Sequence, residues 1–248
     1  MANVIHSKNS LSIQLKQQIV KQIFFLLGFP VLIFIGLILL KVLFGNQTLF
    51  LFGVFAGIFI WGILNAKQYT KIKIIYAGLQ GEKNTNRLLG SLPESYAVLS
   101  DITIEVEGKR SQIDHIVVGP TGVYVIETKN LNGSIVGSES DHQLVQHKIG
   151  RRGGEYSKSF YNPVKQVGTH VYRLATYLKK YSLDTWVQGI VYFSNPDAEV
   201  NVNSEKIPVF CFEEGPNQII RYVMDQEAET LSVEKTKRIV DLLSKLTL

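Results

Sequence analysis

The stretch QIDHIVVGPTGVYVIETK, residues 112–129, decides the fold of the C-terminal part of this chain. Apolar and β-branched residues dominate both of its halves, which is typical of buried strands. Between the halves, Gly119-Pro120-Thr121-Gly122 has the composition of a tight turn. The pattern predicts a hairpin with strands at residues 112–118 and 123–129.

The turn also fixes which residues of the two strands lie opposite one another. If Gly119 pairs with Gly122, Asp114 lies opposite Glu127, unless a bulge shifts the register. Opposed side chains on one face have Cβ atoms about 4.5–5.5 Å apart. Two carboxylates at that separation repel each other among apolar neighbours unless a cation lies between them. The pairing therefore predicts a divalent-cation site, and Mg²⁺ (or Mn²⁺) suits carboxylate oxygens and bound water.

Lys129 adds a positive group to this face of the hairpin. It follows Glu127 by two residues and so points the same way, whereas His115 follows Asp114 and points to the opposite face as a packed histidine. An ammonium there can orient an attacking water or stabilise charge that grows on a phosphate. Two acids, a metal ion and a lysine suffice for metal-assisted phosphodiester hydrolysis. A buried ion cluster without chemistry is the alternative, although such clusters are costly.

Other elements are expected on both sides of the hairpin. Their order of helix, three strands, helix and strand predicts a layered α/β domain. Helices are expected at 79–92, 162–181 and 232–246, further strands at 97–106, 186–193 and 207–212, a weaker hairpin or excursion at 133–149, and a loop at 151–154.

The N-terminal part has a different composition. Residues 23–40 carry no charge, and residues 49–64 form a second uncharged run after a turn at 45–48. Because a membrane-spanning helix needs about 20 apolar residues, residues 23–66 are predicted to form a two-helix transmembrane hairpin. A shallow re-entrant hairpin stays open as an alternative because the second run is short.

Lysine positions predict the orientation of this hairpin. Three lysines precede the first run and three follow the second, whereas the connecting loop has only Lys41. The positive-inside rule therefore places both termini, including the polar segment 1–22, in the cytoplasm. The single cysteine, Cys211, excludes an intramolecular disulfide and a cysteine-based zinc site.

The overall charge favours a partner that carries phosphate. The net charge is +5, which suits nucleic acid or an anionic membrane surface. The segment Gly150–Gly154 lacks the Lys-Ser/Thr pair of a phosphate-binding loop, which disfavours nucleotide binding. Basic residues interleaved with aromatic ones could follow a phosphate backbone and stack bases, and a solvated loop is an equal alternative. These basic residues are Lys148, Arg151, Arg152, Lys158 and Lys165.

Several segments together resemble the NERD (nuclease-related) domain, a family of the PD-(D/E)xK nuclease superfamily. The similar segments are Gly78–Glu82, Gln112–Gly119, Gly122–Asn130, Asn162–Gln166 and Gly189–Phe193. The resemblance covers roughly residues 78–195 and implies a restriction-endonuclease-like core, with residues 196–248 as a C-terminal strand and helix extension. The chain departs from the family at Leu144-Val145-Gln146, where an aromatic residue usually precedes the glutamine.

The resemblance also implies a role for each matching residue. Glu82 would lie at the edge of the metal site, and Gln166 would face it from the second helix. The implied metal ligands are Asp114, Glu127, Glu82 and the backbone carbonyl of Thr128. The implied catalytic set is Asp114, Glu127, Lys129, Glu82 and Gln166, with Lys129 as the lysine that orients water.

Three functions compete on this basis. The first is a membrane-anchored, metal-dependent nuclease that acts on DNA, with RNA left open, at the cytoplasmic face. The second is a membrane module with a nuclease-like fold that binds nucleic acid or protein without cutting. The third is a structural membrane protein that forms homo-oligomers through its glycine-containing apolar helices.

Overall fold

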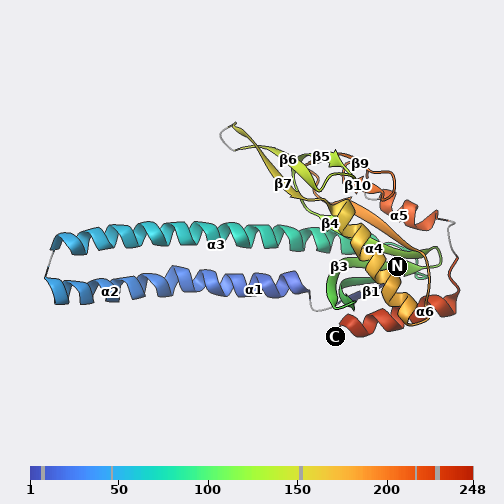
Figure 1. Ribbon diagram of the computed structural model, residues 1–248, viewed down its shortest axis with the longest axis horizontal. Helices are drawn as coiled ribbons and strands as arrows, with labels where there is room; N and C mark the ends of the chain where they lie inside the picture. Colours follow the sequence, from blue (N-terminus) through green and yellow to red (C-terminus); the bar gives the residue numbers. More distant parts are fainter. Residues whose placement is uncertain (7–8, 46, 151–152, 216, 227–229, 248) are drawn as a thin grey trace. The chain divides into compact units, whose positions relative to one another are not determined.

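The chain divides into two compact units, each with its own internal contacts. The computed structural model describes residues 1–6, 9–45, 47–150, 153–215, 217–226 and 230–247 (Figure 1). One unit comprises Ser10–Leu79 and is helical, and the other comprises Met1–Asn9 with Gln80–Leu248. The second unit mixes helices with two sheets, which confirms the expected α/β class.

The helical unit contains both apolar runs. Helix α1 (Ser10–Ile23), a π-helical turn η1 (Phe24–Gly28) and α2 (Phe29–Phe44) lead to Gly45, whose φ of 61° ends α2 in the left-handed region. The stretches Ser10–Leu43 and Phe50–Leu89 are long and apolar enough to cross a membrane, by length and composition only.

Helix α3 (Gln47–Leu89) is one continuous helix. The prediction of a separate helix at 79–92 is therefore wrong, both in its start and in its end. No proline interrupts residues 65–89, so helix propagation, which adds a hydrogen bond per residue, continues to Leu89.

Side-chain hydrogen bonds join α1 and η1 to α3 within the helical unit. Trp61 Nε1 donates to the carbonyl of Phe25 at 2.7 Å, and Gln22 Nε2 donates to Asn65 Oδ1 at 3.0 Å. In a π-helical turn the Phe25 carbonyl would accept from residue 30, but Pro30 has no N–H. The indole therefore satisfies a carbonyl that the proline leaves free.

The larger sheet of the α/β unit has the order β1-β2-β3-β4-β8-β10. Strands β2, β3 and β4 are antiparallel, and β1, β8 and β10 pair in parallel with β2, β4 and β8. The predicted register is confirmed, because Gly119 pairs with Gly122 and His115 with Ile126. The strands are β1 (Asn3–His6), β2 (Ala97–Val106), β3 (Lys109–Gly119), β4 (Gly122–Lys129), β8 (Val187–Phe193) and β10 (Val209–Cys211).

Residues after β4 form a second sheet of four strands in the order β7-β6-β5-β9. The antiparallel strands β5 and β6 confirm the weak hairpin expected at 133–149, whereas β7 and β9 were not predicted. Strand β7 is mostly polar and is exposed on both faces, so it lacks the alternation of apolar and polar residues that predicts a strand. The strands are β5 (Gly133–Ser138), β6 (Gln143–Ile149), β7 (Glu155–Tyr161) and β9 (Ala198–Asn203).

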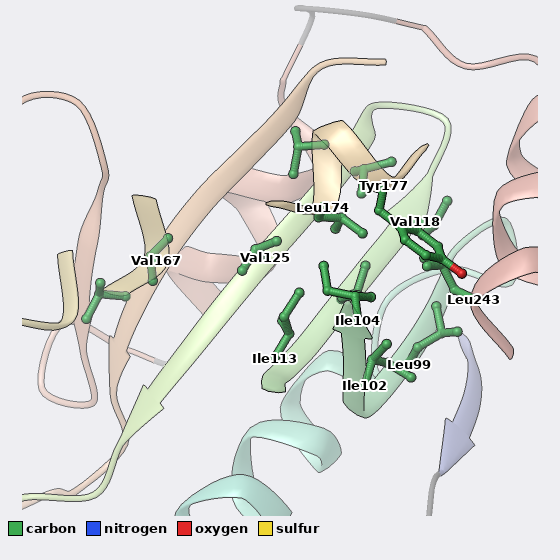
Figure 2. Packing of buried hydrophobic residues seen from close by; sticks show 14 of the residues in the cluster. Leu99, Ile102, Ile104, Ile113, Val118, Val125, Val167, Leu174, Tyr177 and Leu243 are labelled. Carbon is green, nitrogen blue, oxygen red and sulfur yellow. The ribbon is translucent and has the colours of Figure 1, made fainter. Parts of the chain in front are cut away.

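Helix α4 (Pro163–Lys180) covers one face of the larger sheet. It begins as predicted: Pro163 occupies the first turn, and the Asn162 side chain accepts a hydrogen bond from Val164 N at 3.0 Å. Figure 2 shows Val167 and Leu174 of this helix among the core residues of the sheet. This core also includes α6 (Val233–Ser244), which confirms the expected final helix.

A second apolar layer lies on the opposite face of the same sheet. It contains Leu89 from the end of α3, Tyr124 and Ile126 from β4, and Ile219 from α5. Helix α5 (Asn217–Met224) was not predicted. Because both faces of the central strands are covered, a charged residue on either face is removed from water.

Candidate functional site

Strand β4 brings Glu127 to the face that α4 covers, because Glu127 continues the row of Val125, which belongs to the core beneath α4. On β3 both Ile113 and Ile116 belong to this core, so the alternation shifts by one residue at Asp114. The backbone N–H of Thr128 donates to Asp114 Oδ2 at 3.0 Å, which ties the two strands where their ladder ends. The paired residues of the hairpin follow the predicted register as far as His115 and Ile126, and the opposition of Asp114 and Glu127 one step further stays a prediction.

Glu127 is the most buried of the charged residues at this place. It is 2% exposed, and its Oε1 accepts a hydrogen bond from Lys129 Nζ at 2.6 Å. The same ammonium donates to Gln166 Oε1 on α4 at 3.1 Å. The structure therefore brings together Glu127, Lys129 and Gln166, three residues of the expected catalytic set.

His170 is a neighbour that sequence reasoning did not identify. It lies one helical turn after Gln166, is 7% exposed, and has its Nε2 3.7 Å from Glu127 Oε2. The available signal was the spacing, because residues four apart on a helix share a face. Once Gln166 was assigned to the site, its helical neighbour His170 belonged there as well.

Glu82 approaches the same acids from the end of α3. It is 9% exposed and accepts a hydrogen bond from Asn9 Nδ2 at 2.8 Å. Burial raises the pKa of Glu82 to about 7, the bond from Asn9 opposes this, and the carboxylates of Asp101 and Glu127 add to it. The charge of Glu127 therefore contributes to the raised pKa of Glu82.

Asp101 is a further acid that sequence reasoning missed. The β2–β3 ladder pairs Ser100 with His115 and Ile102 with Ile113, and Asp101 interrupts it with a φ of 56°. A non-glycine residue rarely adopts this conformation, and such strain gathers at functional sites. The available signal was an aspartate inside an apolar strand, where that residue is depleted.

The pKa of Asp114 shows that these neighbouring acids disfavour its ionised form. Burial raises its pKa well above the ordinary value, and the carboxylates of Glu127 and Glu82 raise it further. The hydrogen bond from Thr128 N and the charge of Lys129 act in the opposite direction. A carboxylate at this position is therefore costly unless another positive charge joins it.

The donor set fits a cation that supplies most of its own ligands. Among the described residues, no three His, Cys, Asp or Glu side chains form a ready cage for a metal ion. Mg²⁺ does not need such a cage, since it usually keeps several waters and takes one or two carboxylates. Glu127 Oε2 makes no hydrogen bond within the described part of the chain, so a buried acceptor remains for a ligand.

The side chain of Thr128 lies on the other face of the sheet. Its Oγ1 contacts Thr85 Oγ1 at 3.1 Å and His115 Nδ1 at 3.5 Å. His115 is fully buried there, as the sequence predicts. Only the backbone of Thr128 therefore reaches the acids, and its carbonyl as a metal ligand stays an expectation.

The basic residues expected to contact nucleic acid are separate from the acids. Lys148 on β6 pairs with Tyr156 on β7, and the pair Gln146–Lys158 follows it on the same face. Burial and the charge of Lys158 lower the pKa of Lys148, so the two lysines lie close together. Figure 1 shows the β6–β7 ribbon extending past the rest of its sheet.

Of the three remaining basic residues, the structure describes only Lys165. Lys165 lies in the first turn of α4, after β7. Arg151 and Arg152 lie outside the described residues. A pocket of about 860 Å³ beside the ribbon is lined by Lys148 and Tyr156 but also by Glu155, Asp197 and Glu199. Its mixed charge distinguishes it from a purely cationic groove.

The fold and this site define the protein class as an α/β domain with an acid–lysine centre on adjacent strands. The comparison with protein families agrees, because residues 77–194 match the model of the nuclease-related domain, NERD. Residues 77–194 are therefore similar to a nuclease-related domain, and the matched range encloses every residue of the centre from Glu82 to His170.

One relative extends this comparison. An uncharacterized protein of Bacillus anthracis is 42% identical over 98 residues, which is 39% of this chain and 44% of the relative. The match thus spans less than half the length of that relative. No solved structure gives a significant match.

Proposed function

We propose that this chain is a membrane-anchored nuclease that hydrolyses phosphodiester bonds of DNA with a divalent cation, Mg²⁺ or Mn²⁺. Its domain would be a restriction-endonuclease-like core formed by the end of α3, strands β2–β4, α4 and β8. The carrying observation is that Glu127 and Glu82 lie close enough to Asp114 to raise its pKa, and that Lys129 is hydrogen-bonded to Glu127.

Asp114 and Glu127 would hold the cation, with the Thr128 carbonyl and Glu82 as further oxygen donors. A bound divalent cation supplies Lewis acidity and stabilises negative charge on the phosphate. Its charge would also offset the repulsion that raises the pKa of Asp114. The acids that repel one another without a metal ion would therefore favour the binding of a cation.

Lys129 would hold the water that attacks the phosphate. Gln166 Oε1 accepts one of its hydrogen bonds at 3.1 Å and fixes the ammonium at the edge of the acids. Lys129 is partly exposed, with 24% of its side chain accessible, so it can meet both a water and a substrate. Gln166 thus acts by positioning the lysine.

The proposed DNA contact is the face of the β6–β7 ribbon that carries Lys148 and Lys158. Two lysines in close contact gain from an anion between them, and a phosphate backbone supplies a row of anions. Lys165, next to Gln166, would extend this basic surface toward the acids.

Membrane anchoring is supported by the exposed apolar side chains of the helical unit. Phe34, Phe52 and Phe59 are 62%, 75% and 70% exposed, and both apolar stretches are uncovered over their most apolar parts. Apolar surface of this extent is costly in water and is favourable against lipid. The lysine distribution favours an orientation with both termini and the nuclease-related domain at the cytoplasmic face.

The full chain in detergent, incubated with linear, circular and single-stranded DNA and with RNA, tests the proposal. We expect cleavage with Mg²⁺ or Mn²⁺ and none with EDTA. Lys129→Met and Asp114→Asn should each lower the rate by about 10²–10³. Lys180→Met, at the far end of α4, is the matched control. Cleavage that persists unchanged in Lys129→Met and Asp114→Asn would refute the proposal.

A second candidate function is a module that binds nucleic acid without cutting it. The observation that favours it is the closeness of Lys148 and Lys158, which needs no acids to act. Salt-dependent DNA binding that survives Asp114→Asn, without cleavage in any metal, would support this function over the first. A homo-oligomer formed through the apolar helices is compatible with either function.

A further inference from the structure

Two buried polar atoms face each other behind the acid–lysine centre. Glu127 Oε2 and His170 Nε2 are 3.7 Å apart, and neither makes a hydrogen bond within the described part of the chain. More than nine in ten buried polar groups are satisfied in folded proteins. His170 Nδ1 is also without a hydrogen bond within the described part of the chain, so the site holds three such atoms, and their concentration indicates that the contact has a role there.

His170 can carry a proton on Nε2 in either charge state, because the protonated ring has an N–H on both nitrogens. A neutral imidazole carries one N–H. Because the nearest acceptor at Nε2 is a carboxylate oxygen, the tautomer with the proton on Nε2 is the one that Glu127 selects.

Packing alone does not explain a histidine at this place. The neighbouring positions of α4 that face the sheet are Val167 and Leu174, which are fully buried and apolar. An apolar residue at 170 would continue that row without leaving a polar ring unsatisfied, a cost of about 1–3 kcal/mol. The histidine must therefore offer something that an aliphatic side chain lacks.

We propose that His170 is a positioning residue, whose Nε2–H is directed at Oε2 of Glu127 and, together with Lys129 on Oε1, orients this carboxylate for the cation. This inference rests on the proposed metal-dependent function. Glu127 then has one oxygen fixed by α4, and its carboxylate cannot rotate away from Asp114. Partners of this kind, which orient a ligating carboxylate, change metal affinity by 10–100-fold when they are removed.

The test measures divalent-cation affinity, which is independent of cleavage. The full chain in detergent is titrated with Mn²⁺ by calorimetry, as wild type and as His170→Leu, His170→Ala and His170→Gln. We expect 10–100-fold weaker binding in the Leu and Ala variants. His170→Gln should recover most of the affinity, since its amide N–H can reach the same oxygen.

Two controls separate positioning from other effects. His147→Ala removes a histidine bonded to Ser157 on the β6–β7 ribbon and corrects for metal bound by an imidazole elsewhere. Melting of each variant in EDTA shows whether it is folded, and either folded variant, Leu or Ala, carries the test.

The outcomes distinguish this inference from the proposed function. No Mn²⁺ binding by the wild type would overturn the proposed metal site itself. Wild-type binding with equal affinity in folded His170→Leu or His170→Ala would overturn the positioning role alone. If His170→Gln binds as weakly as His170→Ala, the ring acts in some way other than by its hydrogen bond, and the inference is also overturned.

Discussion

Gly81 marks the closest approach of α3 to the sheet, and adding one carbon there should separate function from stability. A Cβ at Gly81 would lie 2.7 Å from Asn130 Cβ and 3.0 Å from Ser194 Oγ. Carbon atoms pack at roughly 3.5–4.0 Å, so in Gly81→Ala the end of α3 must move by about 0.8–1.3 Å. Glu82 is the next residue, and it moves with the helix.

Two opposing terms set the effect of Gly81→Ala on stability. Alanine gains about 1 kcal/mol over glycine inside a helix, whereas overpacking costs about 1–3 kcal/mol. The expected net loss is therefore roughly 0–2 kcal/mol. A displacement of about 1 Å at a catalytic centre can cost 100-fold in rate. We therefore expect a small change in melting and a large change in cleavage.

Thermal unfolding and Mg²⁺-dependent cleavage of linear DNA, measured on the same preparation, check this prediction. Gly168→Ala on α4 is the matched control, because its Cβ would meet Ile207 Cδ1 at an ordinary 3.8 Å. That variant should be up to about 1 kcal/mol more stable and cleave normally. If Gly81→Ala melts higher than wild type and cleaves at the same rate, the close-approach reasoning is wrong.

Three further predictions concern other parts of the chain. The pKa of Glu82 is about 7 in the folded chain, against an ordinary value of 4.5. The free energy of unfolding without metal should therefore fall as the pH rises between these values. Thermal melting in EDTA should show a shallower fall in Glu82→Gln. Lys158→Ser should weaken DNA binding and reduce its salt dependence by about one phosphate contact, measured by titration at several salt concentrations. Trp61→Phe removes the indole bond to the Phe25 carbonyl and should destabilise the helical unit by roughly 0.6–1 kcal/mol in detergent unfolding. An unchanged unfolding midpoint in Trp61→Phe would show that this bond contributes nothing.

The part of the centre that could be predicted is the part that local geometry determines. A turn of known type fixes the register of its two strands, and the period of two then places Glu127 and Lys129 on one face of β4. Asp114 lies where the alternation of β3 shifts, which the turn does not determine. Asn162 and Pro163 likewise predict the start of α4. These inferences need only neighbours in sequence, and the structure agrees with each of the local features.

The parts that could not be predicted depend on how separate elements pack. His170 joins the site because of the rotation of α4 on the sheet, and Asp101 joins it through a local distortion of β2. Strand β1 has four residues and β7 is polar, so neither produces an apolar pattern. Helix α3 continues to Leu89 because no proline interrupts it. The absence of a helix-breaking residue predicts the end of a helix less clearly than the presence of one.

The balance of charge decides between a metal site and an ion cluster that only stabilises the fold. A stabilising cluster would match its charges, because a buried ion without a partner is strongly unfavourable. Here Asp101 and Glu127 act on the pKa of Glu82, and Glu127 and Glu82 act on that of Asp114. Lys129 is hydrogen-bonded to one of these acids, Glu127. Arg173 does not redress this, since its guanidinium is bonded to Ser111 and to the carbonyl of Arg110. An excess of buried negative charge that weakens the empty protein is understandable where a divalent cation completes it.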